Sequence, residues 1–170
     1  KRGYSEDTSR YYGMITNIDD NFGRLLKHLE SKKILDNTII IFMSDNGTSS
    51  LHKEEDLWHS GLKGRKTYVY ENGIRVPMVI YSPKHPKLNG RVEGLTAELD
   101  ILPTLLDLCD INKPKGLQLD GTSFLPLLEK EGASLGDRAI IRQFHGGGSP
   151  TKYRNMAVLK QRYKLVHPGR

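Results

Sequence analysis

The sequence predicts an α/β fold, in which helices flank part of a mixed, mostly parallel sheet and a small antiparallel, β-rich subdomain follows. Three observations support this prediction: a long amphipathic helix near the N-terminus, two apolar segments typical of strands, and a change to strand-like patterns beyond residue 133. We therefore expect residues 1–132 to belong to an α/β domain and residues 133–170 to begin a β-rich subdomain that is incomplete in this chain.

The first expected element is a helix from about Ser9 to Lys32. Asp19 and Asp20 lie within it, but adjacent helix positions point about 100° apart, so the two carboxylates cannot face one ligand. We interpret them as part of a solvated face. Apolar side chains recur at spacings of three and four and form one stripe: Tyr11, Met14, Ile15, Ile18, Phe22, Leu25, Leu26 and Leu29.

Two strands are expected next. The run at residues 38–43 is rich in β-branched residues and lacks polar alternation, which predicts a strand covered on both faces. A second strand is expected at residues 75–81, with Pro77 near its beginning, where strands tolerate proline. The polar stretch at residues 47–73 is longer than an ordinary connection, and loops of this length are usually functional or disordered.

The rest of the chain predicts one more helix and a set of short strands. Asp100 is expected to cap a helix that ends at Cys109, and the thiol is interpreted as a small hydrophobe on the apolar face of that helix. Strands are expected at residues 139–144 and 156–166, the latter as a hairpin that turns near Gln161.

Composition narrows the class of partner. The net charge is +6, and a positive field favours anionic ligands such as phosphate, sulfate, carboxylate or a polyanion. No nucleic-acid partner is expected, because the basic residues are not interleaved with aromatics and no helical or zinc recognition motif is present. No apolar run is long enough for a membrane span, and the single cysteine leaves the redox compartment open.

The candidate site begins where the first strand ends, at Ser44-Asp45-Asn46-Gly47. In open α/β sheets, ligands bind just beyond the carboxyl ends of the strands. Asp45 and Asn46 offer a carboxylate and an amide oxygen there, and such hard donors suit a divalent cation. Taken alone, the same residues are explained equally well as a plain Asp-Asn-Gly turn.

Further motifs follow one another in a characteristic order and spacing. They are Asn21-Phe22-Gly23-Arg24-Leu25-Leu26, Asp36-Asn37-Thr38, Ser44-Asp45-Asn46-Gly47, Gly64-Arg65-Lys66, Tyr70-Glu71-Asn72-Gly73-Ile74-Arg75-Val76-Pro77, Asp100-Ile101-Leu102-Pro103-Thr104-Leu105-Leu106-Asp107-Leu108 and Leu119-Asp120-Gly121. Together these motifs resemble the sulfatase family of the alkaline-phosphatase superfamily, and specifically the C-terminal portion of an arylsulfatase-type enzyme. The resemblance covers most of residues 10–130.

This resemblance implies a calcium site and a sulfate-binding lysine. Asp45 and Asn46 would be two ligands of a single Ca²⁺ ion that residues outside this segment complete. Related phosphatases tend to have His where this chain has Asn46, which favours sulfate esters as substrates. Lys66 matches the family lysine that contacts the sulfate, and is the expected catalytic and substrate-binding residue because its ammonium can neutralise the non-bridging and leaving oxygens.

Further residues of the long loop are weaker candidates. His59 could hydrogen-bond a bridging oxygen or a sugar hydroxyl, and Trp58 could stack on a sugar ring, with a plain surface position as the alternative for both and for His52. Glu71 and Arg75 fall on the family's Tyr-Glu-Gly-Gly-x-Arg segment, which implies a scaffolding ion pair.

The family's nucleophile is a formylglycine made from Cys or Ser in a Cys/Ser-x-Pro/Ala-x-Arg motif, and this sequence does not contain that motif. We expect it in a missing N-terminal part of the same chain, so that the isolated segment would be inactive and would bind calcium weakly. The full-length protein is expected to be a sulfuric ester hydrolase whose substrate is a small-molecule or oligosaccharide sulfate ester. The family also implies an exported (periplasmic or secreted) or lysosomal location.

Two other functions stay open at this point. A phosphate or phosphonate ester hydrolase of the same superfamily would share the fold and Asp45. A non-catalytic binder of sulfated glycans would keep the basic loop after losing the nucleophile.

Overall fold

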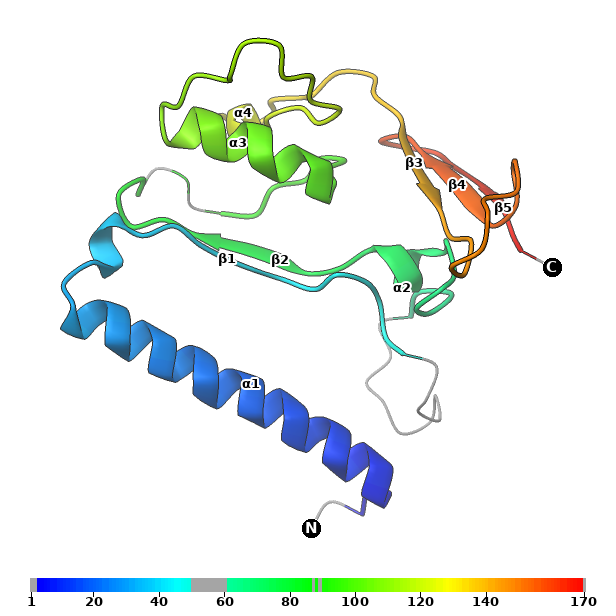
Figure 1. The fold of residues 1–170 in the computed structure, drawn as a ribbon, viewed down its shortest axis with the longest axis horizontal. Coiled ribbons are helices and arrows are strands. Elements are labelled where there is room, and N and C mark those ends of the chain that lie inside the picture. Colours follow the sequence, from blue (N-terminus) through cyan, green and yellow to red (C-terminus); the bar gives the residue numbers. More distant parts are fainter. Residues whose placement is uncertain (1–2, 50–60, 87, 89, 170) are drawn as a thin grey trace.

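The computed structural model describes residues 3–49, 61–86, 88 and 90–169. Figure 1 shows a long helix, α1 (Glu6–Ser31), beside a two-stranded sheet, with a separate three-stranded sheet near the C-terminus. The helices α3 (Ile101–Leu108) and α4 (Leu125–Glu129) lie on the other side of the two-stranded sheet from α1 in this view. The predicted α/β class is confirmed.

The helix α1 begins at Glu6 because Ser5 caps it, its hydroxyl accepting a hydrogen bond of 3.2 Å from the backbone N–H of Thr8. The expected helix is therefore confirmed, with an earlier start than Ser9. Asp19 and Asp20 are both exposed, as expected of a solvated face. A short 3₁₀ turn, η1 (Leu35–Asn37), then leads the chain into the first strand.

The strands β1 (Ile40–Met43) and β2 (Met78–Tyr81) pair in antiparallel register, with Ile41 opposite Ile80. Both lie within the segments predicted as strands. The parallel pairing that the sequence led us to expect is not found among the described strands, because both sheets are antiparallel. Continuous apolar runs are typical of parallel strands that are covered on both faces, whereas β1 is only half-buried. Among its described residues, the connection between β1 and β2 contains the helical turn α2 (Glu71–Ile74).

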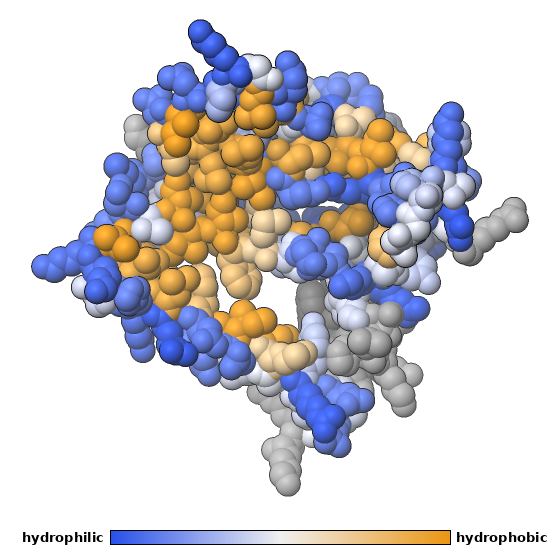
Figure 2. Space-filling view, in the orientation of Figure 1, coloured by the Kyte–Doolittle hydropathy of each residue, from blue (hydrophilic) through white to orange (hydrophobic). Residues whose placement is uncertain are grey.

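The first sheet is less covered than its sequence predicts. Phe42 of β1 contacts Phe22 of α1, with ring centroids 5.6 Å apart, but remains 47% exposed. On α1, Met14 and Ile18 are also more than half exposed. Figure 2 shows apolar side chains gathered over the β1–β2 sheet and α3, with a hollow between them and α1. The strand predicted to be buried on both faces is therefore only half-buried here.

The second sheet consists of β3 (Ile140–Gln143), β4 (Met156–Leu159) and β5 (Lys164–His167), paired in that order. These strands match the segments predicted from the sequence. The chain turns between β4 and β5 as expected, where the N–H of Lys160 donates to the carbonyl of Tyr163 at 2.8 Å. Ile140 of β3 and Ala157 of β4 are buried.

A buried carboxylate joins this second sheet to the rest of the molecule. Asp100, at the end of the turn η3 (Glu98–Asp100), is fully buried. It accepts hydrogen bonds of 2.8 Å from the backbone N–H groups of Ala97 and Thr122, and pairs with both terminal nitrogens of Arg138 at 2.9 and 2.8 Å. Asp100 precedes α3 as predicted, but its expected side-chain cap is wrong because these four donors occupy the carboxylate.

Cys109 also differs from its prediction. The residue follows the last turn of α3 and is exposed, whereas the neighbouring Leu108 takes the buried position at 8% exposure.

Among the described helices, none combines the length and the apolar character that crossing a membrane requires.

Candidate functional site

An open pocket of about 430 Å³ lies where β1 ends. It brings together Asp45, Asn46 and Lys66, which are separated in the sequence and were proposed as site residues. Arg75 also lines the pocket, although the sequence indicated only a scaffolding role for it. The other lining residues are Tyr11, Ser44, Gly47, Thr48, Ser49, Leu62, Asn72, Val76 and Pro77.

A close backbone contact at Gly47 fixes the end of β1 against α2. The N–H of Gly47 donates to the carbonyl of Gly73 at 3.0 Å. A Cβ at position 47 would lie 1.6 Å from the carbonyl oxygen of Asn72, and one at position 73 would lie 2.1 Å from that of Tyr68. Only glycine allows both approaches. The two glycines therefore set where the Asp-Asn pair lies relative to α2.

The segment that carries Lys66 is held by hydrogen bonds on two sides. The N–H of Lys66 donates to the carbonyl of Thr48 at 2.8 Å, which ties the segment to the end of β1. Asn72 of α2 donates its backbone N–H to Lys63 and its side-chain amide to Gly64, both at 2.9 Å. The lysine and the two oxygen donors are thus parts of one hydrogen-bonded unit.

The proposed ligand-binding side chains are not consumed by the protein itself. Within the part of the chain that the structure describes, the carboxylate of Asp45, the amide of Asn46 and the ammonium of Lys66 make no hydrogen bond or ion pair. Asp45 and Lys66 are exposed, and Asn46 is half-buried. All three groups are therefore available to a ligand in the pocket.

The donor set fits a hard cation. Asp45 and Asn46 supply one carboxylate and one amide oxygen from consecutive residues at a strand end. Calcium takes about six to eight oxygen ligands, so these two could form only part of its shell. Among the described residues, no group of three or more His, Cys, Asp or Glu side chains gathers to hold a metal ion.

Arg75 belongs to a chain of charges that reaches the second sheet. Its guanidinium lies 3.9 Å from the carboxylate of Glu71, so the expected ion pair is present, although long. Lys164 of β5 makes the shorter contact with Glu71, at 2.8 Å, and its side chain is only 19% exposed.

The backbone at Asn72, which replaces a glycine of the family motif, is helical. Asn72 lies in α2 and is not among the residues with positive φ, so no left-handed turn is needed there.

The other basic residues of this segment stack on aromatic rings. The Nζ of Lys63 lies 4.3 Å from the ring centroid of Tyr70, and the guanidinium carbon of Arg65 lies 5.5 Å from that of Tyr68. Neither Lys63 nor Arg65 lines the pocket. Of the three basic residues Lys63, Arg65 and Lys66, only Lys66 lines the pocket.

Several predictions fall outside the described residues. His52, Trp58 and His59 lie there, so the proposed contacts of Trp58 and His59 with a sugar stay predictions. Sequence reasoning also gave no pocket role to Tyr11, and only a scaffolding role to Arg75, although both line the pocket. Tyr11 belongs to the apolar stripe of α1 and gave no separate signal, whereas the family motif did contain Arg75.

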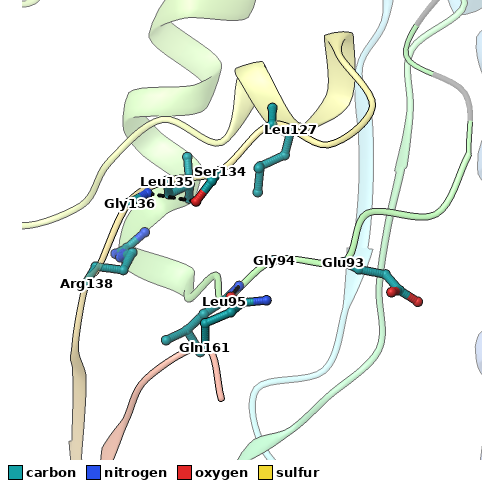
Figure 3. A pocket seen from close by; sticks show the side chains of 10 residues that line it. Glu93, Gly94, Leu95, Leu127, Ser134, Leu135, Gly136, Arg138 and Gln161 are labelled. Atoms are coloured by element: carbon teal, nitrogen blue, oxygen red, sulfur yellow. Dashed lines mark hydrogen bonds between the residues drawn. The ribbon is translucent and has the colours of Figure 1, made fainter. Parts of the chain in front are cut away.

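A second pocket, of about 140 Å³, lies beside the junction with the second sheet (Figure 3). Two of its polar side chains are already engaged: Gln161 accepts a hydrogen bond of 2.8 Å from the N–H of Leu95, and Arg138 pairs with Asp100. None of the site residues predicted from the sequence lines it. We therefore assign it to the junction between the two sheets.

The chain belongs to the sulfatase family. It matches the family described as Sulfatase over residues 2–111, and that described as N-sulphoglucosamine sulphohydrolase, C-terminal, over residues 63–168. The resemblance found in the sequence motifs is thereby confirmed.

Particular relatives extend this result. N-acetylglucosamine-6-O-sulfatase of Bacteroides thetaiotaomicron is 31% identical over 167 residues, which cover 96% of this chain and 28% of the relative. The solved structure of Ps i-CgsB in complex with k-i-k-neocarrahexaose has a TM-score of 0.77 and 29% identity, covering 97% of this chain and 35% of that one. Phosphonate monoester hydrolase of Agrobacterium radiobacter has a TM-score of 0.65 and 29% identity, covering 92% and 32%. The chain spans about a quarter of the length of the curated relatives it matches.

Proposed function

We propose that the full-length protein is a sulfuric ester hydrolase that acts on a sulfated carbohydrate. In this proposal, the described segment supplies two calcium ligands and a sulfate-binding lysine. The observation that carries the proposal is that Asp45, Asn46 and Lys66 line one pocket with their polar groups unengaged by the described residues. The carbohydrate is supported by the relatives, of which one is named for N-acetylglucosamine and another was solved with a neocarrahexaose.

Lys66 has a defined task in this reaction. Its ammonium would contact the non-bridging oxygens of the sulfate and offset the negative charge that develops on the leaving oxygen. Arg75, which also lines the pocket, would add a second positive charge. Asp45 and Asn46 would hold the calcium ion, which would supply positive charge to stabilise the negative charge of the sulfate oxygens.

The rest of the catalytic machinery would come from a part of the protein N-terminal to these residues. We place there the formylglycine nucleophile and the remaining calcium ligands. Met14 and Ile18 of α1 and Phe42 of β1 leave apolar surface open. Soluble proteins rarely expose large contiguous apolar patches, so we propose that this further part packs on them and completes a mixed, mostly parallel sheet. An exported or lysosomal location likewise remains a proposal from the family.

A related hydrolase is the second candidate. The similarity to phosphonate monoester hydrolase favours a phosphate or phosphonate ester as the alternative substrate. The two candidates differ in the substrate that the full-length protein turns over faster.

The variant Lys66→Ala of the full-length protein tests the proposal, with an aryl sulfate and a sulfated N-acetylglucosamine as substrates. We expect kcat/KM to fall about 10²–10³-fold, as when one preorganised electrostatic contact is removed. Lys63→Ala is the matched control, because Lys63 lies on the Tyr70 ring outside the pocket, and should change the rate little.

Three other outcomes would redirect the proposal. Faster turnover of a phosphonate ester would favour the related hydrolase. Salt-sensitive binding of sulfated glycans without turnover would indicate a binding protein. Equal effects of the two lysine substitutions would remove Lys66 from the chemistry.

A further inference from the structure

We propose that Asn155, in the second sheet's connecting loop, is a positioning residue for Lys66. It would act through the carbonyl of Thr67, to which its side-chain amide donates a hydrogen bond of 3.1 Å. The inference rests on the proposed function, because it requires Lys66 to contact the anion. It assigns the C-terminal sheet a part in the geometry of the pocket.

The backbone next to Lys66 is strained. Thr67, the residue that follows it, has a φ of 79°. This left-handed region is unfavourable for residues with a Cβ and is an outlier for a β-branched side chain. Thr67 is exposed, so burial of its side chain does not impose the conformation. A strained backbone of this kind persists only where neighbouring contacts hold it.

Within the described part of the chain, three hydrogen bonds hold this backbone. The N–H of Lys66 donates to the carbonyl of Thr48 at 2.8 Å, and the N–H of Tyr68 donates to that of Arg65 at 2.9 Å. These two bonds lie within the pocket's own segments. The third, from Asn155 to Thr67, comes from a residue 88 positions away. It therefore fixes the peptide plane between Thr67 and Tyr68, one residue beyond Lys66, from outside the local turn.

Asn155 is itself fixed in place. Its φ of 46° lies in the left-handed region, where Asn is tolerated better than most residues. Its amide also donates to the carbonyl of Phe144 at 3.1 Å, and the N–H of Phe144 donates back to the carbonyl of Asn155 at 3.0 Å. Gln143 braces the same loop by donating to the carbonyls of Thr151 and Arg154, at 2.8 and 3.0 Å.

The arrangement of the elements agrees with this role. Figure 1 shows the loop between β3 and β4 beside α2 and the segment that precedes it. Lys164 of β5 makes a second contact to the same region through Glu71. Without the bond from Asn155, Thr67 could relax toward negative φ, which would turn the adjoining peptide and move Lys66 away from the anion. We expect the loss to appear in binding and turnover rather than in folding.

Two substitutions in the full-length protein test the proposal. Asn155→Gly keeps the left-handed backbone and removes the amide, whereas Asn155→Asp keeps the shape and removes the donor. We expect kcat/KM for an aryl sulfate to fall about tenfold in both variants, the size expected for one lost hydrogen bond at a site that must be held in place. The thermal midpoint should change little.

A double-mutant cycle separates positioning from a general structural effect. In the Lys66→Ala background, Asn155→Gly should lower kcat/KM by less than about twofold, because the residue it positions is gone. The affinity for inorganic sulfate, measured by calorimetry on the same four proteins, should follow the same pattern. This binding measurement decides the question even for a protein that turns over no ester.

The possible failures are distinguishable. If Lys66→Ala changes neither turnover nor sulfate affinity, the proposed function fails and the positioning role fails with it. If Lys66→Ala has its expected effect but Asn155→Gly has none, only the positioning role is overturned. An equal factor for Asn155→Gly in both backgrounds would also overturn it, since a merely structural residue behaves in that way.

Discussion

Replacing Arg138 by Met would leave the buried carboxylate of Asp100 without its cation. Asp100 is completely buried, and the side chain of Arg138 is 16% exposed. Removing one partner of a buried ion pair costs about 3–5 kcal/mol, because the other charge stays desolvated. Here the N–H groups of Ala97 and Thr122 still donate to the carboxylate. We therefore expect the lower end of the range, about 3 kcal/mol.

The free energy of unfolding of the full-length protein, measured by urea denaturation, is the appropriate assay. Arg142→Gln, four residues further along in β3, provides a matched control. Arg142 pairs with Glu98, but that carboxylate is 57% exposed, so its loss should cost less than about 1 kcal/mol. Comparing the two variants separates the effect of burial from that of removing one arginine.

The double variant Asp100→Asn/Arg138→Met completes this experiment. Because it leaves no unpaired charge in the interior, it should recover part of the stability lost in Arg138→Met. Equal losses in Arg138→Met and Arg142→Gln would refute the reasoning. So would a double variant that is less stable than Arg138→Met, because the penalty would then not arise from an unpaired charge.

Two further predictions concern the pocket. Gly47→Ala should prevent correct folding, because its Cβ would lie 1.6 Å from the carbonyl oxygen of Asn72, whereas at Gly13 an added Cβ meets nothing within 4 Å. Gly13→Ala should therefore stabilise α1 by up to about 1 kcal/mol; soluble yield and thermal midpoint compare the two, and a normally folded Gly47→Ala protein would contradict the first prediction. EGTA should lower the thermal midpoint of the full-length protein, since a ligand bound by the folded state stabilises it. Asp45→Asn should lose most of that shift, and an unchanged shift would exclude Asp45 as a ligand.

The sequence was most informative where structure depends on local patterns. The stripe of α1, the β-branched run of β1 and the hairpin of β4 and β5 each follow from periodicity over neighbouring residues. The juxtaposition of Lys66 with the Asp45-Asn46 pair came from the family motifs, because spacing alone does not show that a loop lysine returns to a strand end.

The sequence was least informative where a residue's partners lie far along the chain. Asp100 was expected to cap the helix that follows it, but Thr122 and Arg138, which are distant in sequence, provide donors for its carboxylate. Cys109 was expected to be a small hydrophobe on the apolar face of its helix, yet the helix ends just before it and the residue is exposed. Nothing in the residues around Asn155 indicates that its amide reaches Thr67.

These distant contacts bear on how the two sheets work together. The expected boundary between residues 1–132 and 133–170 stays a prediction, but several polar bonds cross it, among them Arg138 to Asp100, Lys164 to Glu71, and Asn155 to Thr67. The last two end on the residue before Asn72 of the pocket wall and the residue after Lys66. A subdomain that bound its own ligand independently would not require contacts with residues next to the pocket. The C-terminal sheet is therefore better understood as a support for the geometry of the site, and its removal should impair anion binding before it impairs the fold of β1 and β2.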